Sequence, residues 1–299
     1  MGLAPRAVVV TRPTELDELL ARHGTRQQAA FFLRSRGRTL DDVEDRHRAV
    51  RDALDGVSAS IPADWRRGHV TRADLDRFLF GPDDCVVVVG QDGLVANVAK
   101  YLDGQPVIGV NPEPDRNAGV LVRHAPAETG PLLAGVASGD VAGMVEARTM
   151  VVARADDGQE LVALNEIYVG DSGHQSARYR LDVGGGTTER QSSSGLLVGT
   201  GTGATGWCRS VWLERRSRLA LPAPVDPSLC WFVREAWPSP TTGTDHTEGV
   251  LGPGEALALV AESDRLVVFG DGIEADAVPL MWGQRLTITR SDRRLQLVA

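Results

Sequence analysis

Residues 84–98 read DCVVVVGQDGLVANV, and this stretch decides the fold of the first half of the chain. The run from Asp84 to Val89 has the continuous β-branched composition of a strand that is buried on both faces of a parallel sheet. A turn with two glycines follows, and the apolar residues after it recur at helical spacing. The stretch therefore predicts a strand, a glycine turn and a helix.

The segments around this stretch extend the same alternation. Residues 7–10 (AVVV) and 106–110 (PVIGV) each read as a buried strand. Thr14 is a candidate N-cap, and Thr39 and Thr71 are each followed three positions later by an aspartate, which resembles a capping box at a helix start. Residues 1–135 are therefore expected to form a doubly wound, Rossmann-like α/β domain.

The pattern changes to frequent short strands from about residue 145 onward. Turn signals rich in glycine, proline and aspartate separate these strands. The strand-like runs are 150–152, 161–169, 177–183, 195–198, 257–260, 266–269 and 285–289. Residues 136–299 are expected to form an all-β domain, and the proline-rich segment 209–247 is assigned no regular structure.

Composition limits the kind of partner. The 299 residues are 42% apolar and 24% charged, as in an ordinary globular protein of two domains. A net charge of −8 opposes binding to nucleic acid and to anionic membranes, and no apolar run has the ~18 residues of a membrane helix. We expect small-molecule partners. The three cysteines lack the spacing of a zinc site or disulfide framework, and the N-terminus lacks a signal peptide, so a cytoplasmic protein is expected.

The turn from Gly90 to Gly93 is the first candidate site. It lies where a parallel strand ends and a helix begins, and free backbone N–H groups and the helix dipole attract phosphate at such a place. Asp92 has the chemistry to accept a proton from a hydroxyl or to orient a metal ion. An Asp-Gly pair also makes a simple tight bend, so the turn alone leaves both readings open.

Three further polar stretches follow along the chain. Asn165-Glu166 interrupts an apolar strand, and either a ligand or solvent at a sheet edge would satisfy these side chains. Residues 200–207 (TGTGATGW) form a loop that permits close approach to sugar or phosphate oxygens, or a flexible hairpin. Asp271-Gly272 ends a strand, as hairpin turns commonly do.

In this order and at these separations, the four features resemble the NAD kinase family, which shares its fold with diacylglycerol and sphingosine kinases. The segments that are most similar to the mitochondrial-type branch are 106–119, 163–166, 177–179, 193–196, 199–203 and 233–235. The resemblance implies an α/β domain followed by a β-sandwich domain that binds NAD. It also implies an ATP-dependent phosphotransferase that moves the γ-phosphate to the 2′-hydroxyl of the adenosine ribose of NAD, giving NADP.

The resemblance also implies roles for individual residues. Asp92 corresponds to the family's catalytic aspartate, the base or orienter of the attacking hydroxyl. The residues implied to bind the nucleotides are Gly90, Gly93, Asn165, Glu166, Thr202, Thr205, Gly206 and Asp271. ATP or polyphosphate with Mg²⁺ is the implied donor, and no residue is assigned as a protein ligand of the metal. Because phosphoryl transfer needs neutralisation of charge, Arg116 and Lys100 are candidate helpers. The implied assembly is a homodimer.

Two residues of the key turn depart from the family pattern. Gln91 stands in place of a glycine, where a side chain is expected to obstruct the backbone or to strain φ. Leu94 stands in place of a threonine and removes a hydroxyl from the helix start. These departures keep two alternatives open: a kinase of the same fold that acts on another hydroxyl acceptor (a nucleoside, sugar or specialised metabolite), and a non-catalytic dinucleotide-binding protein.

Overall fold

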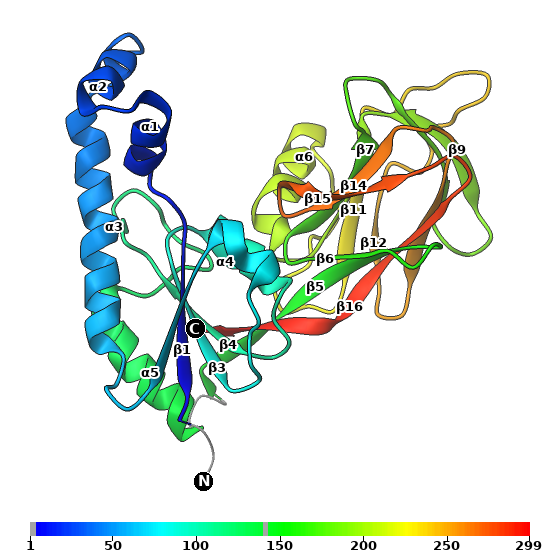
Figure 1. The fold of residues 1–299 in the computed structure, drawn as a ribbon. Coiled ribbons are helices and arrows are strands. Elements are labelled where there is room, and N and C mark those ends of the chain that lie inside the picture. The colour runs from blue at the N-terminus through cyan, green and yellow to red at the C-terminus, as the bar shows by residue number, and fades with distance from the viewer. Residues whose placement is uncertain (1–3, 140–142) are drawn as a thin grey trace. The chain divides into compact units, whose positions relative to one another are not determined.

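The chain forms two compact units, which the computed structural model describes over residues 4–139 and 143–299 (Figure 1). The first unit runs to Glu146 and includes Gln296–Ala299, and the second is Ala147–Leu295. The sequence placed this division between residues 135 and 136. It falls later because Val136 and Val145 pack against the core of the first unit. Leu297 also returns there, pairing with Val107.

Parallel strands form the sheet of the first unit, in the order β2-β1-β3-β4. All six residues of the β3 strand are buried, as its valine-rich sequence predicts for a strand covered on both faces. These strands are β1 (Arg6–Thr11), β2 (Arg66–Thr71), β3 (Asp84–Val89) and β4 (Pro106–Val110). The predicted α/β architecture is confirmed.

Helices cover both faces of these strands (Figure 1). Side chains of α3 and α5, such as Val57 and Leu133, share a core with Val87 and Ile108 of the sheet, while α4 lies on the other face. The helices are α1 (Glu15–His23), α2 (Arg26–Arg34), α3 (Leu40–Ser60), α4 (Asp92–Ala99) and α5 (Thr129–Ser138), with 3₁₀ turns η1 (Arg72–Arg77) and η2 (Pro126–Glu128). In the described residues, no helix is both long and apolar enough to cross a membrane.

Threonine caps explain where three of these helices begin. The hydroxyls of Thr14, Thr25 and Thr39 accept the backbone N–H three residues on, which satisfies one of the unpaired donors of a first helical turn. Thr71 makes no such bond to the backbone and begins only the short η1 turn. The capping pattern at Thr71 therefore predicts a helix start but not the length of the helix.

The second unit is a sandwich of two sheets around one core. One sheet contains β5 (Val145–Ala155), β6 (Glu160–Ala163), β8 (Ala177–Asp182), β9 (Thr188–Ser193), β13 (Ala256–Ala261) and β16 (Arg285–Val298). The other runs β12-β11-β10-β7-β14-β15. Its strands are β7 (Glu166–Asp171), β10 (Gly195–Gly199), β11 (Leu229–Arg234), β12 (Glu248–Leu251), β14 (Leu266–Gly270) and β15 (Ile273–Leu280). Tyr179 and Val198, from opposite sheets, lie in the shared core.

Two local expectations are wrong. Residues 161–169 form two strands, because the chain leaves β6 after Ala163 and enters β7 only at Glu166. The segment 209–247, which was assigned no regular structure, contains most of helix α6 (Trp207–Arg215) and the whole of strand β11. β11 is an interior strand with Leu229 to Val233 buried, and the prolines around it had hidden its apolar run.

Candidate active site

The glycine turn of the first unit joins β3 to α4 at the carboxyl end of the sheet. Gly90 has φ of 156°, and a Cβ there would lie 3.4 Å from Leu94 Cδ2. Gln91 has φ of −115° and ψ of 163°, which is extended backbone open to any residue. The expectation that Gln91 strains φ is therefore wrong, because its backbone does not use the freedom of glycine.

Asp92 is the first residue of α4, and its carboxylate binds a neighbouring backbone loop. Oδ1 accepts the N–H groups of Leu121 at 2.8 Å and Val122 at 3.0 Å, and Oδ2 accepts that of Val120 at 2.9 Å. Gly119 permits this loop because its φ is 66° and a Cβ would lie 2.2 Å from the Val122 carbonyl oxygen. Asp92 therefore fixes the loop against the start of α4, while Oδ2 keeps capacity for another ligand.

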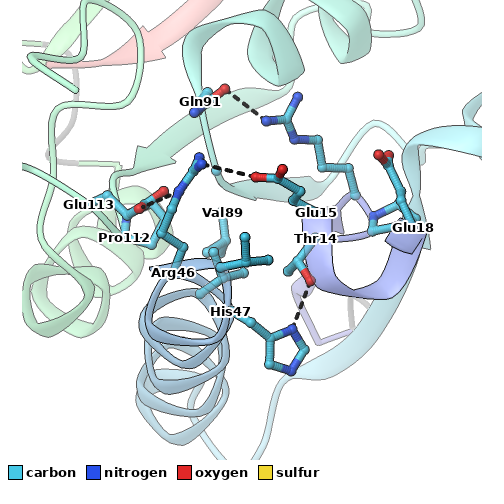
Figure 2. A pocket seen from close by; sticks show the side chains of 14 residues that line it. Thr14, Glu15, Glu18, Arg46, His47, Val89, Gln91, Pro112 and Glu113 are labelled. Atoms are coloured by element: carbon cyan, nitrogen blue, oxygen red, sulfur yellow. Dashed lines mark hydrogen bonds and ion pairs between the residues drawn. The ribbon is translucent and has the colours of Figure 1, made fainter. Parts of the chain in front are cut away.

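A cavity of about 250 Å³ opens beside this turn, entirely within the first unit (Figure 2). It lies between the ends of β1, β3 and β4 and the helices α1 and α3. Arg12 Nη2 donates to Gln91 Oε1 at 2.8 Å across its wall. Arg46 is held by Glu15 at 3.3 Å and by Glu113 at 3.1 Å. The cavity therefore presents two arginines, of which Arg46 is neutralised by its neighbours.

The Asn165-Glu166 pair of the second unit lies at the break between β6 and β7. Asp271 fixes this break: its Oδ2 accepts the N–H of Leu164 at 2.8 Å and its Oδ1 accepts that of Asn165 at 2.7 Å. Asp271 has φ of 55°, a left-handed conformation that aspartate tolerates better than most residues. Asp271, a predicted binding residue, is thus placed where it orients the Asn165-Glu166 backbone.

The glycine-threonine loop packs directly on that pair. Thr200 Oγ1 donates to the Leu164 carbonyl at 2.6 Å and accepts the N–H groups of Thr202 and Gly203. A Cβ on Gly203 would lie 2.2 Å from the Asn165 carbonyl oxygen and 3.1 Å from Glu166 Oε2, so only glycine fits. The loop is therefore held within contact of the Glu166 carboxyl group.

Two polar side chains of this cluster are largely withdrawn from water. The Thr202 hydroxyl is buried and has no hydrogen bond to any described residue. Burial, and to a lesser extent the charge of Asp271, raises the pKa of Glu166 to about 8. A buried hydroxyl and a desolvated carboxyl group cost free energy unless a ligand satisfies them. Sugar hydroxyls have the donors and acceptors that both groups need.

The structure thus gathers most of the predicted binding residues into one cluster of the second unit. These are Asn165, Glu166, Thr202, Thr205, Gly206 and Asp271. Gly90, Asp92 and Gly93 belong to the first unit. Arg116 and Lys100 do not line the cavity at Gly90, whereas Arg12, which sequence reasoning missed, does. Its position directly after a buried strand was the available signal, because carboxyl ends of parallel strands share one edge.

Known NAD kinases resemble the chain in sequence. No protein-family model matches the chain. It is 26% identical to the mitochondrial NAD kinase 2 of Rattus norvegicus over 255 residues, covering 69% of the chain and 60% of that protein. The chain is also 31% identical to the NAD kinase of Methanoregula boonei over 192 residues, covering 59% of the chain and 69% of that protein.

The fold is also similar to that of NAD kinases. The chain superposes on an NAD kinase from Archaeoglobus fulgidus in complex with ATP with a TM-score of 0.59 at 18% identity, over 98% of this chain and 93% of that one. This likeness shows that the two-unit architecture is the NAD kinase fold. Together with the 31% identity to the Methanoregula boonei protein, it establishes that the chain belongs to the NAD kinase family. The chain nevertheless spans only about 60% of the length of the rat protein.

Proposed function

We propose that the protein transfers the γ-phosphate of ATP to the 2′-hydroxyl of the adenosine ribose of NAD and so produces NADP. The observation that carries the proposal is the cluster in the second unit, where Glu166 and Thr202 present polar groups that a ribose would satisfy. Membership of the NAD kinase family and the ATP complex of the Archaeoglobus relative support the choice of acceptor and donor.

In this reaction the 2′-oxygen forms a bond to the γ-phosphorus as the bond between that phosphorus and the β,γ-bridging oxygen breaks, and ADP leaves. The 2′-hydroxyl loses its proton, for which Asp92 is the proposed acceptor or orienter. Asp92 is preorganised for this because three N–H donors fix its carboxylate. The role of the protein is otherwise positioning and neutralisation of charge, which dominate phosphoryl transfer.

Mg²⁺ is part of the proposal. This ion is usually held by donor phosphates and only one or two carboxylates, so a site with few protein ligands suits it. Asp92 Oδ2 is the oxygen that would hold it, because it accepts one N–H, that of Val120 at 2.9 Å, whereas Oδ1 receives contacts from all three loop N–H groups. When bound, the ion would supply charge neutralisation between the β- and γ-phosphates.

The proposal extends to assembly and location. We place the protein in the cytoplasm as a homodimer. Three free, buried cysteines support a reducing compartment. The homodimer rests on the family resemblance of the sequence.

Incubation with ATP, Mg²⁺ and NAD tests the function. NADP formation is expected, and Asp92→Asn is expected to lower its rate by about 10²- to 10⁴-fold, the usual contribution of a general base. Asn keeps an acceptor oxygen for the backbone loop, and Asp64→Asn, at an exposed position of the same unit, is the control. NAD binding without NADP formation would favour the dinucleotide-binding alternative. ATP consumption only with another hydroxyl compound would favour a different acceptor.

A further inference from the structure

Arg12 differs from Arg46, the other arginine at the cavity beside the glycine turn. Its guanidinium donates to the neutral amide of Gln91, and no described carboxylate lies within ion-pair distance of it. Arg46, the other arginine of the lining, is bound by two glutamates. Arg12 therefore retains an uncompensated positive charge at the edge of the sheet where the glycine turn lies.

Gln91 orients the guanidinium group of Arg12. Arginine has only donors, so the atom that faces it must be the amide oxygen, and the amide nitrogen points elsewhere. That nitrogen makes no hydrogen bond to a described residue, and Gln91 immediately precedes the first turn of α4. Three kinds of hydrogen-bond donor thus lie together: the guanidinium, the amide nitrogen and the backbone N–H groups of the helix start. Donors grouped in this way bind an anion.

The acidic residues of the lining do not cancel Arg12. Glu15 and Glu113 are engaged by Arg46, and Glu15 is also bound by Arg38 at 2.5 Å. Glu18 is the one lining carboxylate with no ion pair to a described residue, and it is exposed to solvent. At about 250 Å³ the cavity lies below the ~300–1,000 Å³ of a typical pocket for a drug-sized ligand, so it suits a phosphate chain better than a whole dinucleotide.

We propose that Arg12 binds the terminal phosphates of the phosphate donor and that Gln91 is the residue that positions its guanidinium. The inference rests on the proposed function, in which Asp92 of this turn would hold the Mg²⁺ of the donor phosphates. It also assigns a role to Gln91: this side chain, which stands in place of a glycine, holds the Arg12 guanidinium where the phosphates bind.

Steady-state kinetics of the 299-residue chain distinguish an effect on donor binding from an effect on acceptor binding. Arg12→Ala is expected to raise KM for MgATP by about 10- to 100-fold, the range for loss of hydrogen bonds to a charged group, with KM for NAD unchanged within about twofold. Arg12→Lys should recover part of the loss, because it restores the charge without the planar fork. Arg34→Ala, which removes an exposed arginine of α2 outside this cavity, is the control and should change neither constant.

Two further variants test positioning and charge. Gln91→Glu should raise KM for MgATP more than Gln91→Ala, because a carboxylate would pair with Arg12 and cancel its charge. Glu18→Gln should lower KM for MgATP, because it removes a negative charge from the lining. Equal effects of the two Gln91 variants, or a higher KM in Glu18→Gln, would contradict the proposal.

Calorimetric titration with inorganic triphosphate and Mg²⁺, without NAD, separates this inference from the proposed function. Triphosphate binding that is lost in Arg12→Ala but kept in Arg34→Ala supports the inference even if no NADP is ever formed. Formation of NADP with an unchanged donor KM and unchanged triphosphate affinity in Arg12→Ala would overturn the inference and leave the function standing. A wild-type protein that neither binds triphosphate nor forms NADP would overturn both.

Discussion

Glu166→Gln offers a quantitative test of the second-unit cluster, through the dependence of stability on pH. Burial and the neighbouring charge of Asp271 raise the pKa of Glu166 from 4.5 to about 8. Between these values the folded state holds a proton that the unfolded state has lost. Stability therefore falls as pH rises across this window. The interval from 4.5 to about 8, at ~1.4 kcal/mol per pH unit, corresponds to a loss of at most ~5 kcal/mol.

Glutamine has the shape of protonated glutamate and does not titrate. The variant should therefore match the wild type in stability near pH 5 and become progressively more stable than the wild type up to pH 9. Urea unfolding of the full chain at a series of pH values, followed by tryptophan fluorescence, measures this difference. Five of the six tryptophans, all but Trp65, belong to the second unit, so the signal reports mainly on that unit.

The control is Glu274→Gln, at an exposed position of β15 in the same unit. Its stability should follow that of the wild type at every pH. Wild type and Glu166→Gln that lose stability in parallel from pH 5 to pH 9 would refute the placement of Glu166 in a desolvated site. Saturating NAD should also reduce the difference if the ribose satisfies the carboxyl group.

Two further substitutions test packing, one in the second-unit cluster and one at the start of β3. Gly203→Ala places a Cβ 2.2 Å from the Asn165 carbonyl oxygen and should lower stability by ~1–3 kcal/mol. Gly252→Ala, whose nearest neighbour is the flexible Glu255 carboxylate at 3.4 Å, should change the thermal midpoint little, and equal midpoints for the two variants would contradict the tight loop contact. Asp84→Asn removes the buried carboxylate whose Oδ1 accepts a hydrogen bond from Arg6 Nε at 2.7 Å, and it should lower the free energy of unfolding in urea by ~1–3 kcal/mol. The exposed Asp83→Asn should cause no clear change, and an Asp84→Asn variant as stable as the wild type would show that the pair contributes little.

The sequence predicts an element best when its burial is uniform. β3 is buried along its whole length, so its composition alone identifies it. β2 reads RRGHVT and buries only Val70, because it is the edge strand of its sheet, and no apolar pattern marks it. β11 is as buried as β3, but the prolines of the surrounding segment outweighed its apolar run. Local composition thus indicates how buried a strand is, and it does not by itself reveal whether a strand is present.

The candidate site shows a similar limit. The motifs predict which residues gather at each cluster, but the groups that orient them are backbone atoms. Asp92 is fixed by N–H groups of residues 120–122, and Asp271 binds the N–H groups of Leu164 and Asn165, more than a hundred positions away. Backbone donors leave no trace in the choice of side chain, so only the folded chain shows that these two aspartates organise loops.

The two departures from the family turn are the features whose meaning changes most. Leu94 is 2% exposed and packs beneath Gly90, so the position of the missing hydroxyl is part of the core. Gln91 adopts ordinary extended backbone and directs its amide oxygen to Arg12. Neither residue strains the turn. The objection that they raise against phosphate binding therefore reduces to one physical question: whether phosphates bind beside an Arg12–Gln91 pair as well as they bind over bare glycine backbone. The uncompensated charge of Arg12 favours binding, because it offers the phosphates a charge-assisted donor that glycine lacks.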